Sequence, residues 1–333
     1  MSPKPHCVVT TINPPTAGVQ KLGKLFPGAL IVVGDNKTPS NWSCDDAWFL
    51  PIKGQYKSGF EFVDHAPQNH YARKNIGYLQ AMRLGASVIY DTDDDNIPSK
   101  AWKLRGKEVR ARVVGAQGWC NVYQCFHTAR IWPRGLPLEC ALADKPLATK
   151  TLSIDSSPIQ QGLADLSPDV DAVWRLVMPQ RIVFRKKESV TLADGVWCPF
   201  NSQTTWWWPE AYALMYLPVY ATFRMTDIWR SFIAQRCLWQ LGYSVTFHSP
   251  AEVVQERNPH DLMRDFKDEL PGYLRNQCII ERLGGLRLKR GPGTACDNLI
   301  ACYDALITDG TLPPAEMASV MAWASDVRSL QHG

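Results

Sequence analysis

Apolar runs of strand length alternate with helix-spaced apolar residues over the first hundred positions. Three runs predict strands, and the second is continuous, as in a parallel strand buried on both faces; they cover residues 6–12, 29–35 and 87–91. Apolar residues at helical spacing between these runs favour helices over 16–25 and 70–84, with Gly85 as the C-cap of the second. This alternation is typical of an open, mostly parallel α/β sheet.

The pattern is less regular after residue 100. We expect a loop over 133–168. A clear helical stripe follows Asp227 and ends at Gly242, and a short strand is expected over 244–248. Residues 260–330 read as several helices, with breaks expected at Pro271, Gly284-Gly285, Gly291-Pro292-Gly293 and Pro313-Pro314.

An acidic cluster follows the predicted strand at 87–91. Four carboxylates lie within five positions, at Asp91, Asp93, Asp94 and Asp95. So many like charges at one strand end repel one another unless a cation neutralises them, and Mg²⁺ or Mn²⁺ is the natural partner of oxygen ligands. Such an ion usually also binds substrate phosphates. The alternative is an acidic turn in contact with water.

The predicted topology favours a binding site over an acidic turn. In open α/β sheets, ligands bind outside the carboxyl ends of the strands. Thr10, Thr11 and Asp35 follow two of the predicted strands, as the acidic cluster follows the third. We expect these three side chains to line a nucleoside pocket, with Asp35 on the base or ribose; otherwise they are turn residues.

Composition excludes several classes of function. The 333 residues carry 36 basic and 32 acidic side chains, a balance that argues against nucleic acid as a partner. Because no run of about 18 apolar residues is present, we expect no membrane span. The N-terminus lacks the form of a signal peptide, and ten cysteines without a Cys-x-x-Cys pair suit a reducing cytoplasm.

Familiar catalytic motifs are missing. There is no Gly-x-Gly-x-x-Gly after the first strand and no Walker A sequence, which argues against dinucleotide and P-loop sites. No Gly-x-Ser-x-Gly elbow offers a hydrolase nucleophile.

A site that binds a substrate diphosphate through a metal ion needs further side chains, for charge neutralisation, proton transfer and metal binding. Arg73 and Lys74 could neutralise phosphate charge, or they form an exposed pair on a helix. Asp227 is the candidate general base toward an alcohol acceptor, and it is equally suited to cap a helix N-terminus. His248 or His260 could complete the metal shell through an imidazole nitrogen; otherwise both are structural.

Several stretches of the chain together resemble a known family. It looks like a nucleotide-diphospho-sugar glycosyltransferase of the GT-A type and, more narrowly, is similar to the STELLO glycosyltransferase-like family over roughly residues 6–260. A weaker similarity links its acidic cluster to the UDP-arabinopyranose mutases, or reversibly glycosylated proteins. The stretches that carry the main resemblance occur in one order, at residues 33–39, 71–78, 89–95, 162–175, 199–204 and 223–230.

The resemblance implies a GT-A fold, an open mixed and mostly parallel Rossmann-like sheet with a helical C-terminal tail. It implies a GT-A domain over 1–260, with a nucleotide-binding half (1–100) and an acceptor half (101–260), followed by a helical extension over 261–333. It also implies a UDP- or GDP-sugar donor and Mn²⁺ or Mg²⁺. It places Asp93 and Asp95 on the metal and nucleotide, and Asp227 near the acceptor.

The leading hypothesis is therefore a metal-dependent, inverting glycosyltransferase acting on a saccharide or other hydroxyl acceptor, expected in the cytoplasm because no anchor is visible. Arg224 or Arg230 would hold an anionic acceptor or the departing phosphate. Asn201, Gln203 and part of Trp206, Trp207 and Trp208 would form the sugar or acceptor wall; three consecutive Trp cannot all face one way in a strand. The alternatives are a sugar-nucleotide mutase or self-glycosylating protein, and a non-catalytic scaffold.

Overall fold

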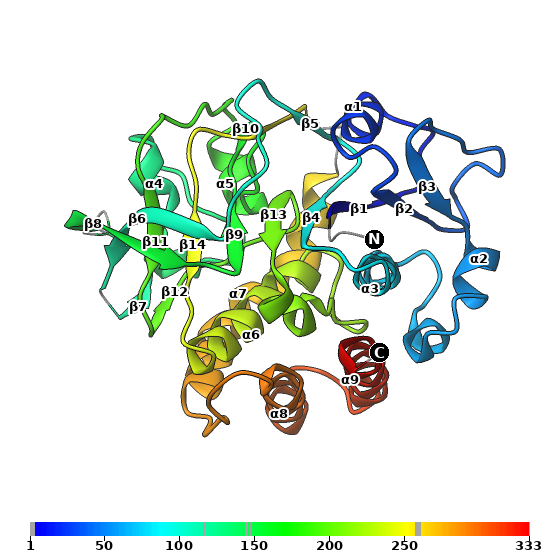
Figure 1. The fold of residues 1–333 in the computed structure, drawn as a ribbon. Helices are drawn as coiled ribbons and strands as arrows, with labels where there is room; N and C mark the ends of the chain where they lie inside the picture. Colours follow the sequence, from blue (N-terminus) through cyan, green and yellow to red (C-terminus); the bar gives the residue numbers. More distant parts are fainter. Residues whose placement is uncertain (1–3, 116, 144–145, 147, 257–260, 333) are drawn as a thin grey trace.

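A ten-stranded mixed sheet forms the centre of the molecule (Figure 1). The computed structural model describes residues 4–332 apart from 116, 144, 145, 147 and 257–260. From one edge to the other, the strands of the sheet are β3 (Ala47–Leu50), β2 (Leu30–Gly34), β1 (Pro5–Thr11), β4 (Val88–Thr92), β13 (Thr204–Trp207), β9 (Ile159–Gln161), β14 (Val245–Phe247), β11 (Ser189–Leu192), β6 (Glu108–Val114) and β8 (Ala148–Ser156).

The N-terminal part of this sheet is parallel, as predicted. Strands β3, β2, β1 and β4 run in one direction, whereas β13 joins β4 and β9 by antiparallel pairing. Two smaller sheets flank the large one: β10 (Ala164–Leu166), β15 (Val253–Gln255) and β5 (Asn96–Pro98) form the first, and β12 (Val196–Trp197) and β7 (Gly118–Trp119) form the second.

Helices cover both faces of the sheet. The α-helices are α1 (Ala17–Leu25), α2 (Ile52–Tyr56), α3 (Lys74–Arg83), α4 (Tyr123–Phe126), α5 (Ala172–Val177), α6 (Thr226–Gln240), α7 (Leu262–Gly284), α8 (Ala295–Thr308) and α9 (Glu316–His332). Among the described residues, none of these helices combines the length and apolar character that crossing a bilayer requires.

The parallel strands separate two hydrophobic clusters because successive side chains of a strand point to opposite faces. Val8, Ile31 and Ile89 belong to the large cluster, which also contains buried residues of α3, α6, α8 and α9. Val9 and Tyr90 belong to the smaller cluster, which packs under α1 and includes Trp206 and Trp208. The alternation of apolar residues thus decides which layer each strand residue joins.

Helix α3 lies unusually close to the sheet. A Cβ at Gly77 would come within 2.6 Å of the side chains of Val8 and Val33, so glycine is required for this approach. The close packing brings the N-terminal turn of α3, with the 3₁₀ turn Tyr71–Arg73 before it, to the carboxyl end of β4.

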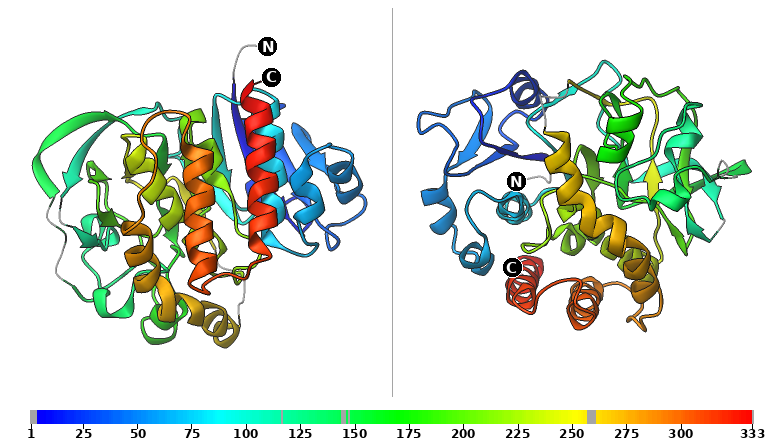
Figure 2. Two further views of the ribbon diagram at one scale, coloured as in Figure 1. Left: turned by 90° about the horizontal axis from the view of Figure 1, so that it is seen from below. Right: turned by 180° about the vertical axis from the view of Figure 1, so that it is seen from behind.

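The C-terminal helices form a layer that packs against the rest of the fold (Figure 2). Helices α7, α8 and α9 pack side by side, and α9 also contacts α3 and the 3₁₀ helix Glu61–His65. Buried residues of this layer, including Trp323, share the large cluster with the sheet.

Most predicted elements are confirmed, with two exceptions. The strands and helices predicted over 6–35 and 70–91 are present, and Gly85 takes the positive φ of a residue after a helix end. The predicted loop at 133–168 is wrong, because this segment contains β8, β9 and β10. The edge strand β8 was not predicted because its many polar Thr, Lys and Ser side chains interrupt the apolar pattern of a strand. The predicted break at Pro271 is also wrong, because α7 continues through it, whereas the other three breaks do separate or end helices.

Candidate functional site

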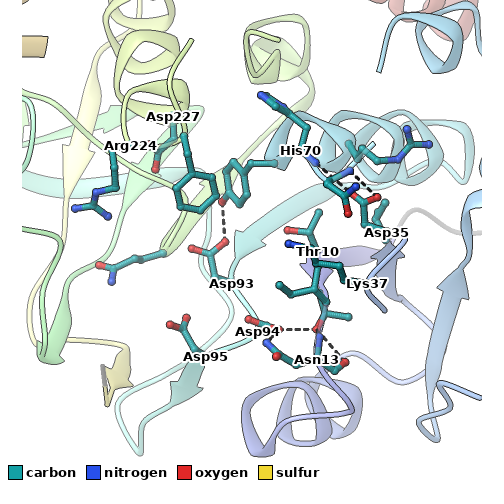
Figure 3. A pocket seen from close by; sticks show the side chains of 18 of the residues that line it. Thr10, Asn13, Asp35, Lys37, His70, Asp93, Asp94, Asp95, Arg224 and Asp227 are labelled. Carbon is teal, nitrogen blue, oxygen red and sulfur yellow. Dashed lines mark hydrogen bonds between the residues drawn. The ribbon is translucent and has the colours of Figure 1, made fainter. Parts of the chain in front are cut away.

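A cavity of about 430 Å³ opens at the carboxyl ends of β1, β2 and β4 (Figure 3). Strand β1 lies between β2 and β4, so the chain passes to one side of β1 first and returns to its other side with β4. This reversal is the topological switch point at which open α/β sheets bind ligands. Its described lining includes the predicted residues Thr10, Thr11, Asp35, Arg73, Asp93, Asp95, Gln203, Arg224 and Asp227.

The four carboxylates of the acidic cluster have different roles. Asp91 is fully buried on β4 and forms ion pairs with Lys74 at 2.8 Å and Arg230 at 3.0 Å, so it is structural. Asp94 turns toward β1, where it accepts hydrogen bonds from the Thr11 hydroxyl at 2.5 Å and the Asn13 amide at 3.0 Å. These contacts hold the turn in place.

Asp93 and Asp95 are the members of the cluster best placed for an ion. Asp93 accepts hydrogen bonds from the Tyr71 hydroxyl at 2.7 Å and from Lys74 at 2.9 Å, and Asp95 accepts one from the Gln255 amide at 2.7 Å. Burial raises the pKa of Asp93 to about 7; Lys74 opposes this effect and the neighbouring Asp95 adds to it. The site therefore favours additional positive charge beside these two oxygen-donor side chains.

Lys74 and Arg73 are both buried, so the alternative of an exposed helix pair is wrong. Lys74 contacts Asp91, Asp93 and the Thr92 carbonyl oxygen, and it is not part of the cavity wall. Although burial alone would lower its pKa, these carboxylates raise the pKa of Lys74 well above the usual value. Lys74 therefore neutralises part of the acidic cluster from the protein interior and does not reach the cavity.

Arg73 supports the cavity wall through contacts with Gln55 and Ala66. Its guanidinium donates to the Gln55 side chain at 2.8 Å and to the Ala66 carbonyl oxygen at 2.8 Å, which leaves only part of it at the cavity. A cation that the sequence analysis missed is Lys37, which is exposed at the cavity and has no ion-pair partner among the described residues.

Asp35 organises the wall of the cavity that follows β2. Its carboxylate accepts hydrogen bonds from the backbone N–H groups of Asn36 at 2.7 Å, Asn69 at 2.8 Å and His70 at 3.0 Å. His70 also lines the cavity; burial lowers its pKa, and Asp35 opposes that effect. The histidine was not predicted, although it immediately precedes the stretch 71–78 that carried the family resemblance.

Asp227 lies across the cavity from Asp35, near Arg224 (Figure 3). It is in the first turn of α6 but does not cap the helix, because the N-cap residue is Met225 and makes no side-chain cap. Its carboxylate instead pairs with Arg134 at 3.0 Å and accepts the Ser202 N–H at 3.2 Å. The capping alternative is therefore wrong, and the position of Asp227 is set by tertiary contacts.

An ion-pair network surrounds Asp227. Arg134 donates two hydrogen bonds of 2.8 Å to Asp169, and Arg224 pairs with Glu269 at 2.8 Å. Burial would lower the pKa of Arg134, but Asp169 and Asp227 raise it well above its usual value. Arg134 was missed because it lies in the segment expected to be a loop, whereas Asp169 lies within the stretch 162–175.

Three predicted substrate residues are not at the cavity. Trp207 is fully buried in the large hydrophobic cluster, and the Arg230 guanidinium lies 5.0 Å from its ring centroid. Arg230 also bonds to the Ser202 hydroxyl at 2.9 Å and pairs with Asp91, so it too is committed to the interior. Asn201 is buried and accepts the Gln203 N–H at 2.9 Å, which orients the loop before β13.

The predicted third metal ligand is not supported at His248. This side chain is buried between Ser189 at 2.7 Å and Gln160 at 2.9 Å, away from the cavity lining, and burial lowers its pKa well below the usual value. His260 lies outside the described residues. Within the described part of the chain, no three His, Cys, Asp or Glu side chains form a ready metal cage. Mg²⁺ in proteins is commonly held by only one or two carboxylates, and Asp93 and Asp95 offer two.

Comparisons with known proteins agree on one family. The family model for STELLO glycosyltransferases matches residues 224–330. Two curated proteins of Arabidopsis thaliana are each 30% identical: "Probable glycosyltransferase STELLO1" over 73% of this chain and "Probable glycosyltransferase STELLO2" over 78%.

The matched regions cover 34% and 37% of these two relatives, so the chain spans about a third of their length. The two relatives and the family model are all named as glycosyltransferases. The mixed α/β sheet with its C-terminal helices is consistent with a glycosyltransferase fold. Together these matches support a STELLO-like glycosyltransferase family for this chain.

Proposed function

We propose that the chain is a metal-dependent glycosyltransferase that moves a sugar from a UDP- or GDP-sugar to a hydroxyl group of a saccharide acceptor, with inversion. The observation that carries this proposal is the arrangement of one cavity, with Asp93 and Asp95 beside its centre, Asp35 on one wall and Asp227 on the other. The similarity to the STELLO glycosyltransferases supports the reaction class.

Asp93 and Asp95 would hold Mn²⁺ or Mg²⁺, which supplies positive charge for the diphosphate and its leaving group. Tyr71 and Lys74 fix the Asp93 carboxylate from behind. Thr10 and Asp35 would border the nucleoside, and Lys37 offers a cation at the same wall.

Asp227 is suited to act as the general base. It would accept the proton of the acceptor hydroxyl while that oxygen bonds to the anomeric carbon and the bond from this carbon to the phosphate oxygen breaks. Such a displacement inverts the anomeric centre. Arg134 and the Ser202 N–H hold the carboxylate in one orientation for this transfer.

A thermal-shift screen of UDP- and GDP-sugars, with and without Mn²⁺, tests the proposal. A ligand that binds only the native state raises the melting temperature, so we expect stabilisation that requires both nucleotide sugar and metal. Asp95→Ala should remove this shift. Asp304→Ala is the matched control, because Asp304 is an exposed carboxylate on α8, away from the cavity. Equal shifts in wild type and Asp95→Ala would contradict the metal assignment.

A further inference from the structure

Phe223 presents an aromatic face at the cavity. Its side chain is 60% exposed and lines the cavity, where most of the other lining residues are of polar or charged types. Its ring meets Tyr71 edge to face, with centroids 5.7 Å apart. The predicted aromatic wall at Trp206, Trp207 and Trp208 is buried, and among the described residues Phe223 and Tyr71 are the Phe and Tyr side chains that line this cavity.

The backbone around Phe223 is firmly held. The hydroxyl of Thr222 donates to the Asp268 carbonyl oxygen at 2.6 Å, and Arg224 pairs with Glu269 at 2.8 Å. Further back along the chain, Glu316 accepts the N–H groups of Val219 at 3.0 Å and Tyr220 at 2.8 Å. The exposed ring is thus presented by an anchored segment, and its exposure does not reflect a free loop tip.

The position of Phe223 points to the acceptor side of the cavity. Through Tyr71 the ring is linked to Asp93, and four residues later α6 carries Asp227. Asp35, which borders the donor nucleoside in the proposed function, lies with His70 on the other side of the cavity from Asp227 (Figure 3). A molecule that brings a hydroxyl to Asp227 therefore passes beside the Phe223 ring.

We propose that Phe223 is a stacking platform for the acceptor, and that the acceptor is a saccharide that lays the flat C–H face of a pyranose or furanose ring on it. This inference rests on the proposed glycosyltransferase function and adds a specificity-determining residue for the acceptor. The ring offers a rigid apolar surface to the C–H face. The surrounding Arg, Asp and Gln side chains offer hydrogen bonds to the sugar hydroxyl groups.

The test compares transfer to a saccharide with donor hydrolysis, because hydrolysis needs no saccharide. The donor is the nucleotide sugar that stabilises the protein most with Mn²⁺, and the acceptors are methyl glycosides and the disaccharides cellobiose, maltose and lactose. Loss of one aromatic contact of about 1.4 kcal/mol corresponds to tenfold, so Phe223→Ala should raise the acceptor KM about tenfold. Its donor hydrolysis rate and its Kd for the nucleotide with Mn²⁺ should stay within about twofold of wild type.

Two further variants separate stacking from a general disturbance. Phe223→Tyr keeps the aromatic face and should keep the acceptor KM. Tyr220→Ala removes an aromatic side chain that is 52% exposed on the same segment but does not line the cavity, so its acceptor KM should also stay unchanged.

Three outcomes would overturn the inference. The first is an unchanged acceptor KM in Phe223→Ala. The second is weaker nucleotide binding in that variant, which would assign the ring to the donor. The third is a wild-type protein that binds the nucleotide sugar yet transfers to none of these saccharides. A wild-type protein that binds no nucleotide sugar would instead contradict the proposed function itself.

Discussion

Charge pairing determines what individual residues around the cavity can do. Asp91, which looked like part of the ion site, is neutralised by Lys74 and Arg230 inside the protein. Removal of one partner from a buried pair leaves an uncompensated charge, so these residues contribute to stability rather than to substrate binding. Asp93, Asp95 and Asp227 line the cavity, so substitutions at these positions should change metal binding or catalysis.

Asp227→Asn should lower kcat for transfer by about 10²–10⁴-fold, because the amide cannot accept the acceptor proton. Nucleotide binding in Mn²⁺ should remain, since the donor-facing wall is unaltered. The measurement pairs steady-state transfer rates with calorimetric nucleotide binding. Asp169→Asn also removes one carboxylate from Arg134, so an equal loss of kcat in both variants would assign Asp227 to positioning Arg134 instead.

Asp171 caps α5 by accepting the Trp174 N–H at 2.7 Å, and it also accepts the Trp132 indole N–H at 2.7 Å. Burial raises the pKa of its carboxyl from 3.8 to about 6. Because the folded state binds this proton more tightly than the unfolded state, the resulting stability is present at low pH and lost as pH rises through about 6.

Urea unfolding of wild type and Asp171→Asn across this range isolates the titration of Asp171. The difference between their free energies of unfolding should change by about 2 kcal/mol between about pH 4.5 and about pH 7, in the direction that wild type loses stability as pH rises. A constant difference would show that Asp171 has the same pKa in the folded and unfolded states.

At the scale of elements, α7 shows how tertiary contacts outweigh local preference. Pro271 lies inside this helix, where it removes a backbone hydrogen bond, and the next residue is Gly272. A Cβ at Gly272 would come within 2.3 Å of the Met225 sulfur, which is buried just before α6. The packing of α7 on α6 therefore requires glycine at position 272, whereas Pro271 weakens the helix without interrupting it.

Alanine at these adjacent positions should have opposite effects. Pro271→Ala should raise the free energy of unfolding by about 1–3 kcal/mol, because it restores a helical N–H donor and removes a steric clash with the preceding turn. Gly272→Ala should lower it by about 1–3 kcal/mol through overpacking against Met225. Chemical denaturation of both variants checks the prediction; stabilisation by Gly272→Ala would show that Met225 moves aside freely.

At the scale of the whole molecule, α9 joins the two walls of the cavity. Glu316 at its start accepts the N–H groups of Val219 and Tyr220 and a hydrogen bond from the Tyr216 hydroxyl. Asp326 near its end accepts the N–H groups of Glu61 and Phe62, each at 2.9 Å. One helix thus fixes the segment that leads to Phe223 and the segment that leads to His70.

Removal of residues 313–333 should therefore prevent cooperative folding. The deletion uncovers the site of Trp323, which is fully buried, and leaves Phe62 without its helix contacts. Circular dichroism melting of the shortened chain should lack a single sharp transition, whereas the full chain should show one. A shortened chain that melts cooperatively and still binds nucleotide would show that residues 313–333 are separable from the rest of the fold.

The sequence by itself determined the parallel strands with their helices, the helical C-terminal part and the acidic cluster at a strand end, because hydrophobic period and strand length are local properties. Only the tertiary structure decided which carboxylates face the cavity, that Lys74, Arg230 and Trp207 are interior, and that Arg134, Lys37 and Phe223 join the site. Those assignments depend on contacts between residues far apart in the chain, such as Arg134 with Asp227 and Lys74 with Asp91. A local pattern indicates which helix or strand carries a side chain. Packing and charge pairing between distant segments decide which residues that side chain contacts.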